Sequence, residues 1–398
     1  MQFAIRNPGE RWALVNGRIV LPDAVVEGQA LLIEDGKIAG LVPDGDLSLG
    51  SAISTVDAGG RLITPGLIDI HTHGALGHTF NEPTAEAFAA ITAENARQGV
   101  TSLLATLLTA PVEDLVRCLE FAARWMGGAR AGAQVLGVHL EGPYFSPAQK
   151  GAQDPGNLRT PDDGTADRLL AWHRILRIVT FAPELPGALE FTARLAQLGL
   201  APAAGHSAAT DADVQAAMEQ GLRHVVHLWS GQSSTVRQGP WRAPGLLEAS
   251  LVFENLTAEI IADNRHLPPT LMKLAFKCLG PDRLCAVSDA SSGAGLPEGA
   301  RYRMGQMEYE VHDGVGMLLD RSAFAGSTTL LNRMAPVLRD VVGIPLAQAV
   351  RMVTLTPARI IGVDRQKGSI EAGKDADLAV FDDDFTAWGV VIGGGWYR

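Results

Sequence analysis

One pattern recurs along this chain: an apolar run that ends in residues able to bind a metal or transfer a proton. The first example is residues 66–74, which ends in His71 and His73. In a β-strand, residues two apart point to the same side, so both imidazoles would project toward one point. Runs of the same form occur at residues 134–143, 201–207, 224–230, 256–266 and 284–290.

Segments with helical character separate these runs and predict an alternating α/β fold. They span residues 85–98, 112–126, 166–178, 188–198, 211–220 and 270–279. Residues 101–109 and 178–184 supply two more strands, which makes eight βα units over roughly residues 61–345. This arrangement is typical of a (β/α)8 barrel, where functional groups come from the C-terminal ends of different strands.

Both ends of the chain carry short alternating segments that predict a second, smaller unit. Residues 11–58 contain Asn16-Gly17 and Asp35-Gly36, two dipeptides typical of β-hairpins, and residues 368–398 have a similar pattern. Few-stranded pieces are marginally stable alone. We therefore expect one small β-sandwich built from residues 1–60 and 361–398, with the barrel inserted as residues 61–360.

Composition excludes several classes of protein. The net charge of −11 argues against a nucleic-acid partner. No apolar run reaches transmembrane length, and residues 1–20 lack a signal-peptide pattern. The three cysteines show no metal-site spacing and predict reduced, buried thiols. We expect a cytoplasmic protein with a small-molecule substrate and no membrane partner.

Taken in order, the motifs resemble the amidohydrolase superfamily. More narrowly, the chain is similar to N-acetylglucosamine-6-phosphate deacetylases. The similarity covers essentially the whole chain, and each motif alone is weak whereas the set is specific. The segments that carry it are residues 71–73, 139–143, 205–207, 227–228, 242–245, 261–266, 288–290, 355–358 and 368–378.

Amide hydrolysis requires a nucleophile, a polarised carbonyl and a proton for the leaving amine. A divalent metal supplies the first two, because it lowers the pKa of bound water and acts as a Lewis acid. Glu141, His206 and His227 form a mixed oxygen and nitrogen ligand set of the kind zinc takes at catalytic sites. The resemblance implies that they hold the tighter metal. Asp289 would move the proton, unless it is only a helix N-cap after a strand.

His71 and His73 could hold a second, weaker metal, with Glu141 bridging the two. The resemblance implies this possibility, because family members that have the His-x-His pair use two metals and others use one. Asp69 and His139 lie two residues before a ligand on the same strand face. They would either orient the ligands from one layer deeper or form a polar pair in the barrel interior.

The resemblance also implies the residues that bind substrate, and here the chain departs from the family. Arg242 and His266 match positions that contact the phosphate and sugar, although Arg242 could be an ordinary surface charge. Where the family has an asparagine-containing segment after the sixth-strand histidine, this chain has Ser230 and Gly231. Gln153 stands in place of a histidine near the acetyl carbonyl.

We expect metal-dependent hydrolysis of N-acetylglucosamine-6-phosphate to glucosamine-6-phosphate and acetate, and the resemblance suggests a homodimer. One alternative is a deacylase of the same superfamily that acts on another N-acyl amino sugar or on an N-acyl amino acid. A second is a non-catalytic scaffold with this fold, as among dihydropyrimidinase-like proteins. The scaffold is disfavoured because a buried cluster of histidines and carboxylates is costly without a metal to neutralise it.

Overall fold

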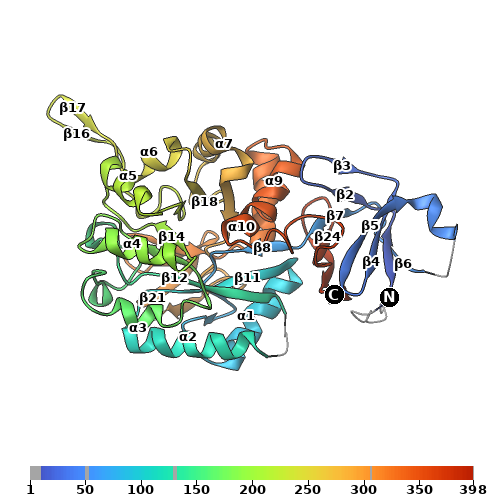
Figure 1. Ribbon diagram of the computed structural model, residues 1–398, viewed down its shortest axis with the longest axis horizontal. Coiled ribbons are helices and arrows are strands. Elements are labelled where there is room, and N and C mark those ends of the chain that lie inside the picture. Colours follow the sequence, from blue (N-terminus) through green and yellow to red (C-terminus); the bar gives the residue numbers. More distant parts are fainter. Residues whose placement is uncertain (1–9, 50–52, 129–131, 305–306, 398) are drawn as a thin grey trace.

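A barrel of parallel strands forms the centre of the molecule (Figure 1). The computed structural model describes residues 10–49, 53–128, 132–304 and 307–397. The barrel strands neighbour one another in sequence order, which confirms the predicted fold. They are β8 (Leu67–Asp69), β11 (Val100–Leu107), β12 (Gln134–Glu141), β13 (Leu176–Phe181), β14 (Ala201–Ala204), β15 (His224–Val225), β18 (Thr257–Ile261) and β19 (Leu284–Val287).

The first and last barrel strands meet just beyond their C-terminal ends. Thr72 forms a parallel bridge with Ala290, and the backbone N–H of Asp289 donates to the carbonyl oxygen of His71 at 2.8 Å. The residues that follow β8 and β19 thus join the two strands, and they include predicted site residues from both.

Helices surround the barrel. They are α1 (Ala85–Arg97), α2 (Val112–Met126), α3 (Ala166–Leu170), α4 (Ala188–Gln197), α5 (Asp211–Glu219), α6 (Leu246–Val252), α7 (Pro269–Arg283), α8 (Met334–Pro336), α9 (Leu346–Met352) and α10 (Leu355–Ile360). The predicted helix over residues 166–178 is wrong beyond Leu170, because Ile178 and Val179 are fully buried in strand β13. β-branched residues of this kind suit a strand buried on both faces.

Two small sheets pack together beside the barrel and form the predicted sandwich. The first has the order β5-β4-β1-β6 and the second β26-β25-β24-β7-β2-β3. Their shared core contains Trp12 and Leu31 from the beginning of the chain and Leu378 and Trp396 from its end. The strands are β1 (Trp12–Val15), β2 (Arg18–Val20), β3 (Val25–Val26), β4 (Gln29–Glu34), β5 (Lys37–Pro43), β6 (Ser54–Asp57), β7 (Leu62–Pro65), β24 (Leu378–Phe381), β25 (Ala387–Ile392) and β26 (Gly395–Trp396).

Only one of the two predicted turns is a hairpin. Asp35-Gly36 joins the paired strands β4 and β5. Asn16-Gly17 instead leads from β1 in one sheet to β2 in the other. Gly17 packs so closely on β7 that an added Cβ would lie 2.4 Å from Ile63 Cδ1. β7 itself lies just beyond the sandwich limit predicted at residue 60, and residues 1–9 of the predicted sandwich are outside the described part of the chain.

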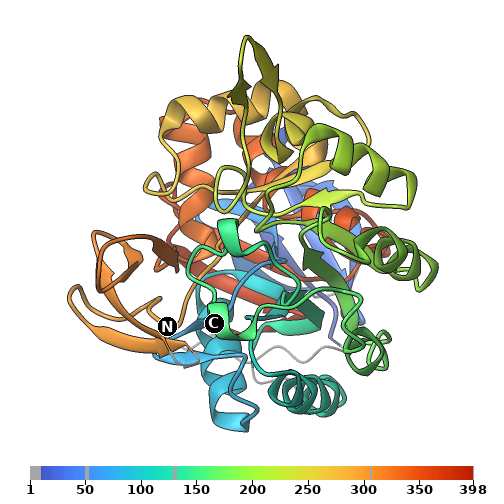
Figure 2. The same ribbon diagram turned by 90° about the vertical axis from the view of Figure 1, so that its left-hand side faces the viewer.

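Two excursions from the barrel were not predicted. After β19 the chain forms an antiparallel insert sheet of β20 (Arg301–Met304), β21 (Met307–His312), β22 (Val315–Leu318) and β23 (Phe324–Ser327) (Figure 2). Before α6, strands β16 (Val236–Gln238) and β17 (Trp241–Ala243) form a hairpin that projects from the molecule (Figure 1). A short pair, β9 (Gly74–Ala75) and β10 (His78–Thr79), follows β8.

Two expectations from composition can be compared with the structure. Cys118 and Cys285 are buried as predicted, whereas Cys278 is exposed, because its side chain lies on the outer face of α7. Among the described residues, no helix has both the length and the apolar character needed to cross a membrane.

Candidate active site

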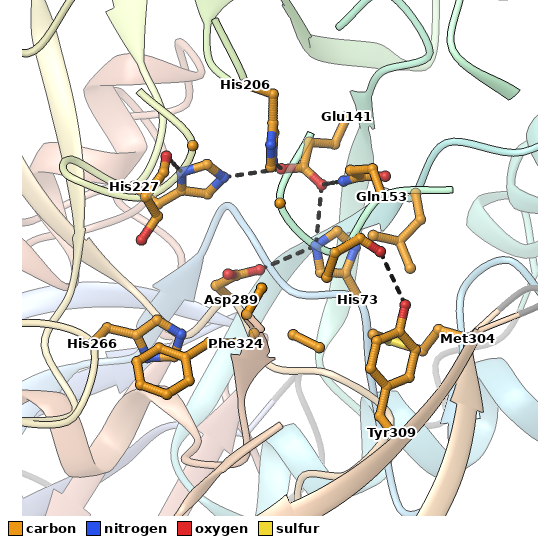
Figure 3. A pocket seen from close by; sticks show the side chains of 18 residues that line it. His73, Glu141, Gln153, His206, His227, His266, Asp289, Met304, Tyr309 and Phe324 are labelled. Carbon is orange, nitrogen blue, oxygen red and sulfur yellow. Dashed lines mark hydrogen bonds and ion pairs between the residues drawn. The ribbon is translucent and has the colours of Figure 1, made fainter. Parts of the chain in front are cut away.

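A pocket of about 190 Å³ opens at the C-terminal ends of the barrel strands (Figure 3). Its lining combines metal-capable side chains at the base with residues of the insert sheet along one side. The predicted site residues in the lining are His73, Glu141, Gln153, His206, His227, Ser230, Gly231, His266 and Asp289.

Glu141, the last residue of β12, lies at the centre of the predicted ligands. Its Oε1 atom is 3.0 Å from His227 Nε2, 3.1 Å from His206 Nε2 and 3.5 Å from His71 Nε2. Its Oε2 atom is 3.4 Å from His73 Nε2. All five predicted ligands therefore face a common region, the four histidines through Nε2 and Glu141 through both carboxylate oxygens.

Asp289 lies on the opposite side of the same cluster. Its Oδ1 atom is 3.1 Å from His73 Nε2 and 3.6 Å from His71 Nε2. The His71 Nε2 atom is buried and has no hydrogen-bond partner among the described residues. An unpaired buried nitrogen that faces two carboxylates suits a bound cation. The donor set therefore fits the divalent metal that the sequence predicts.

Both carboxylates in the cluster are ionised at neutral pH. Burial raises the pKa of Glu141, but His71, His206 and His227 together lower it well below the ordinary value. Burial also raises the pKa of Asp289, but the neighbouring His73, His71 and His227 lower it overall below its ordinary value. An ionised carboxylate at Asp289 is able to accept a proton.

Three site residues lie in the left-handed backbone region just after their strands. The φ angles are 47° for His206, 24° for His227 and 44° for Asp289. Each such residue stores on the order of 1–3 kcal/mol of strain, which the surrounding structure must oppose. Near Asp289 the packing depends on Gly326, where an added Cβ would lie 2.5 Å from the Asp289 carbonyl oxygen. The turns thus direct these side chains into the pocket.

Three of the ligand histidines donate a hydrogen bond from Nδ1 to a backbone carbonyl oxygen. The pairs are His73 with Thr106 at 3.3 Å, His206 with Gln149 at 3.0 Å, and His227 with Ser230 at 3.1 Å. A carbonyl can only accept, so the proton lies on Nδ1 and Nε2 remains available as a ligand.

Asp69 and His139 lie one layer deeper, as predicted. Asp69 accepts hydrogen bonds from the Ser288 hydroxyl at 2.5 Å and from the backbone N–H of His71 at 3.3 Å. Burial raises the pKa of Asp69 to about 7. His139 contacts the carbonyl oxygen of Ile70, and burial lowers its pKa to about 3. Asp69 thus ties the strand of His71 to the strand of Asp289.

Most predicted substrate-binding residues line the pocket. Gln153 accepts from the Thr109 backbone at 3.1 Å and donates to Glu141 Oε2 at 2.8 Å. His266 lies across the pocket with its ring centroid 5.0 Å from that of Phe324 (Figure 3). Gly231 approaches His206 so closely that an added Cβ would be 2.8 Å from Nδ1.

Arg242 is the exception. It lies on β17 in the projecting hairpin, is exposed, and donates to the Pro240 carbonyl oxygen at 3.3 Å. It is not among the residues that line the pocket. Within one chain, the structure does not bring Arg242 to the other site residues.

Sequence reasoning missed two sets of residues. The insert sheet contributes Met304, Tyr309 and Phe324 to the pocket, and the turn signal Asp313-Gly314 at its β21–β22 connection could have revealed it. Glu259 lies behind the cluster, 2.8 Å from His71. Its signal is a lone carboxylate within the apolar strand β18.

Comparison with known proteins agrees with this geometry. Residues 62–396 match the Amidohydrolase family, which covers most of the chain. The chain belongs to the amidohydrolase family. Together with the relatives described next, this assignment identifies the chain as a hydrolytic enzyme.

Relatives of this amidohydrolase carry sugar-phosphate deacetylase names. It is 33% identical to an N-acetylgalactosamine-6-phosphate deacetylase of Escherichia coli O157:H7, over 92% of this chain and 93% of the relative. It is 31% identical to the N-acetylglucosamine-6-phosphate deacetylase of Haemophilus influenzae, over 97% of this chain and 99% of the relative. The structure of N-acetylglucosamine-6-phosphate deacetylase from Pasteurella multocida has a TM-score of 0.91 at 28% identity, over 98% of this chain and 100% of that one.

A fourth comparison includes a ligand. A variant of the Mycobacterium smegmatis N-acetylglucosamine-6-phosphate deacetylase, solved in complex with N-acetylglucosamine-6-phosphate, has a TM-score of 0.89 at 30% identity. The alignment covers 98% of this amidohydrolase and 99% of that chain.

Proposed function

We propose that this amidohydrolase removes the acetyl group from N-acetylglucosamine-6-phosphate. The observation that carries the proposal is one cluster of five ligand-capable side chains and Asp289. Four of the five line the pocket together with Asp289, and the fully buried His71 contacts both Glu141 and Asp289. The names of the relatives supply the substrate class. The compartment that we infer is the cytoplasm.

Glu141, His206 and His227 would hold the tighter metal, and His71 and His73 the second, with Glu141 between them. A bound divalent metal would activate water and polarise the amide carbonyl. We infer zinc, because histidine nitrogens with a carboxylate oxygen are its usual ligands at catalytic sites.

The other side chains of the pocket have separate tasks in this proposal. Asp289 accepts the proton of the attacking water and returns it to the amine nitrogen. The 3.1 Å contact with His73 keeps its carboxylate oriented toward the cluster. Gln153 holds Oε2 of Glu141 in place. Phe324 and Met304 exclude water from the side of the pocket that faces the insert sheet.

The phosphate needs a cationic partner, and no lysine or arginine is found among the described residues that line the pocket. Arg237 and Arg242 are cross-strand neighbours on the projecting hairpin, and neither pairs with a carboxylate in the described part of the chain. Two adjacent guanidinium groups suit a phosphate. The hairpin also exposes Val236 and Trp241, which supports a homodimer in which it packs against a second copy.

A second candidate function follows from the same absence of cations. The pocket of a single chain suits an unphosphorylated N-acyl amino sugar, which carries no charge and would need no arginine. An N-acyl amino acid fits this observation less well, because its carboxylate also calls for a cationic partner. The altered residues Ser230 and Gly231 are compatible with this alternative.

A substrate screen decides between the two. Acetate release should be measured with N-acetylglucosamine and N-acetylgalactosamine, each with and without the 6-phosphate, and with N-acetyl amino acids. We expect kcat/KM to be highest for N-acetylglucosamine-6-phosphate, by at least about tenfold over the unphosphorylated sugar, because a charge-assisted contact is worth about 2–5 kcal/mol. A preference for an unphosphorylated substrate would overturn the proposal.

A further inference from the structure

Glu259 is a completely buried carboxylate that does not line the pocket. It lies in the middle of β18, and its side chain has no exposure to solvent. Its Oε2 atom is 2.8 Å from His71 Nδ1, and its Oε1 atom is 3.0 Å from His224 Nε2. A buried charge of this kind is retained only where its partners are well placed.

His71 differs from the other ligand histidines in the group that holds its Nδ1 atom. His73, His206 and His227 each face a backbone carbonyl at that position. His71 faces the carboxylate of Glu259. A hydrogen bond to a carboxylate is stronger than one to a neutral carbonyl, and it increases the basicity of the imidazole as a ligand.

The direction of these hydrogen bonds follows from the partners of Glu259. Each of its two oxygens lies within hydrogen-bond distance of an imidazole nitrogen, Oε2 of His71 Nδ1 and Oε1 of His224 Nε2. A carboxylate whose two oxygens both face ring N–H groups accepts both hydrogen bonds. His71 therefore donates from Nδ1, which leaves Nε2 as the atom that would bind a metal; it faces the cluster, 3.5 Å from Glu141 and 3.6 Å from Asp289.

His224 in turn holds Glu259. Its Nδ1 atom is 2.8 Å from the hydroxyl of Thr257, so both ring nitrogens have partners. The backbone N–H of His227 also points toward Glu259 Oε2, at 3.4 Å. The side chain of Glu259 thus contacts the imidazole of one predicted ligand, His71, and the backbone N–H of a second, His227.

Glu259, His71 and His139 could also be read as a metal site of their own, because their ligand atoms lie close together. Both nitrogens of His139 are already occupied, one by the Ile70 carbonyl at 3.1 Å and the other by the Thr180 hydroxyl at 2.7 Å. The 2.8 Å contact of Glu259 with His71 is an ordinary hydrogen-bond distance. The network therefore suits the support of a ligand better than a third ion.

We propose that Glu259 is the positioning residue that makes His71 a ligand of the second metal, and that His224 holds Glu259 in place. The inference rests on the proposed metal site and is independent of which substrate the enzyme uses. Its failure is therefore distinguishable from that of the proposed deacetylation.

The test measures metal affinity directly. Wild type, Glu259→Gln and Glu259→Met are stripped with a chelator, reloaded with Zn²⁺, and titrated against a chromophoric competitor. For the weaker equivalent, we expect Kd to rise by about 10-fold in Glu259→Gln and by up to about 100-fold in Glu259→Met, as for other residues that orient a metal ligand. The tighter equivalent should change by less than about threefold, since His206 and His227 keep the carbonyl oxygens that hold their Nδ1 atoms.

Asp263→Asn is the matched control. Asp263 is another buried carboxylate that pairs with a histidine, His266, at 2.7 Å, and it follows the same strand. None of its described hydrogen bonds reaches a predicted metal ligand. Its substitution should leave both Zn²⁺ affinities unchanged.

A spectroscopic readout covers the case in which Glu259→Met fails to fold. In the Zn²⁺-loaded protein, the Nδ1 proton of His71 should resonate downfield of those of the other ligand histidines, because only it is bonded to a carboxylate. In the isosteric Glu259→Gln variant it should move upfield to join them.

Three results would overturn the inference. The first is a weaker Zn²⁺ equivalent whose affinity is unchanged in both variants, with the His71 proton also unmoved. The second is wild-type protein that binds a single equivalent, because His71 would then have no second ion to hold. The third is a third equivalent that disappears with Glu259, which would make Glu259 itself a ligand.

Discussion

At the scale of single residues, the site depends on atoms placed just past the ends of strands. Asp289 is held at two points: its Oδ1 atom lies 3.1 Å from His73 Nε2, and its backbone N–H donates to the carbonyl oxygen of His71. This double attachment keeps the carboxylate in one orientation while its pKa remains low. The geometry suits a group that takes a proton and gives it back.

Asp289→Asn should therefore retain the fold and the bound metal but lose most of kcat. The side chains have nearly the same shape, and the loss of general acid–base catalysis typically lowers the rate by about 10² to 10⁴. The measurements are steady-state kinetics with elemental analysis of the same preparation. Normal turnover by the variant would show that another group moves the proton.

Removal of the metal should abolish activity without unfolding the barrel. Protein purified without chelator should contain about one to two equivalents of divalent metal, according to the usual ligand counts of catalytic sites. Activity should disappear on chelation and return on reloading, while circular dichroism stays nearly constant. Full activity in protein shown to be metal-free would contradict the proposed chemistry.

At the scale of elements, the insert sheet and the projecting hairpin differ in their relation to the site. The insert sheet packs directly over the pocket, where the Tyr309 hydroxyl donates to the carbonyl of Ala152 at 3.0 Å, next to Gln153. The hairpin instead points away from the barrel with Arg242 exposed (Figure 1). For Arg242 to contact a substrate phosphate, as proposed, the hairpin would have to move or belong to a second copy.

Arg242→Ala should lower kcat/KM for the phosphorylated sugar by well over an order of magnitude and barely change it for the unphosphorylated one. The reason is that a charge-assisted contact in a desolvated pocket is worth about 2–5 kcal/mol. Arg124→Ala is the control, since Arg124 is an exposed arginine on α2, paired with Glu120. Equal losses on both substrates would show that Arg242 has a structural role.

At the scale of the whole molecule, the two ends of the chain are held together by one core. Trp12 from β1 is completely buried, packs edge-on against Trp396 with ring centroids 6.1 Å apart, and donates to the carbonyl of Gly394 at 3.1 Å. The sandwich that contains this core therefore needs both ends of the chain, and the barrel strands that carry the site lie between those ends in the sequence.

Trp12→Ala should reduce the free energy of unfolding by about 3–5 kcal/mol, the usual range when a large aromatic side chain is removed from a core. Chemical denaturation monitored by circular dichroism provides the measurement. Val252→Ala at an exposed position should change stability by no more than about 0.5 kcal/mol. A similarly small effect at Trp12 would mean that the two ends fold independently of each other.

Local sequence patterns predicted the barrel and placed the metal-capable residues at the C-terminal ends of its strands, whereas the family resemblance supplied their roles. The period of two places His71 and His73 on one face of a strand, and apolar runs mark where Glu141, His206 and His227 end their strands. These signals lie within a few residues of one another, so they can be read along the chain. The sandwich followed because neither end could bury enough apolar surface alone.

Other features were decided only when the strands closed into a barrel. Glu259 and His71 are 188 positions apart in the sequence, and no local pattern indicates that their side chains meet. Arg242 matches a motif, yet the hairpin carries it outside the pocket of its own chain. A strand's own residues determine which side chains point inward, whereas the wrapping of distant strands around one axis determines which of those side chains become partners.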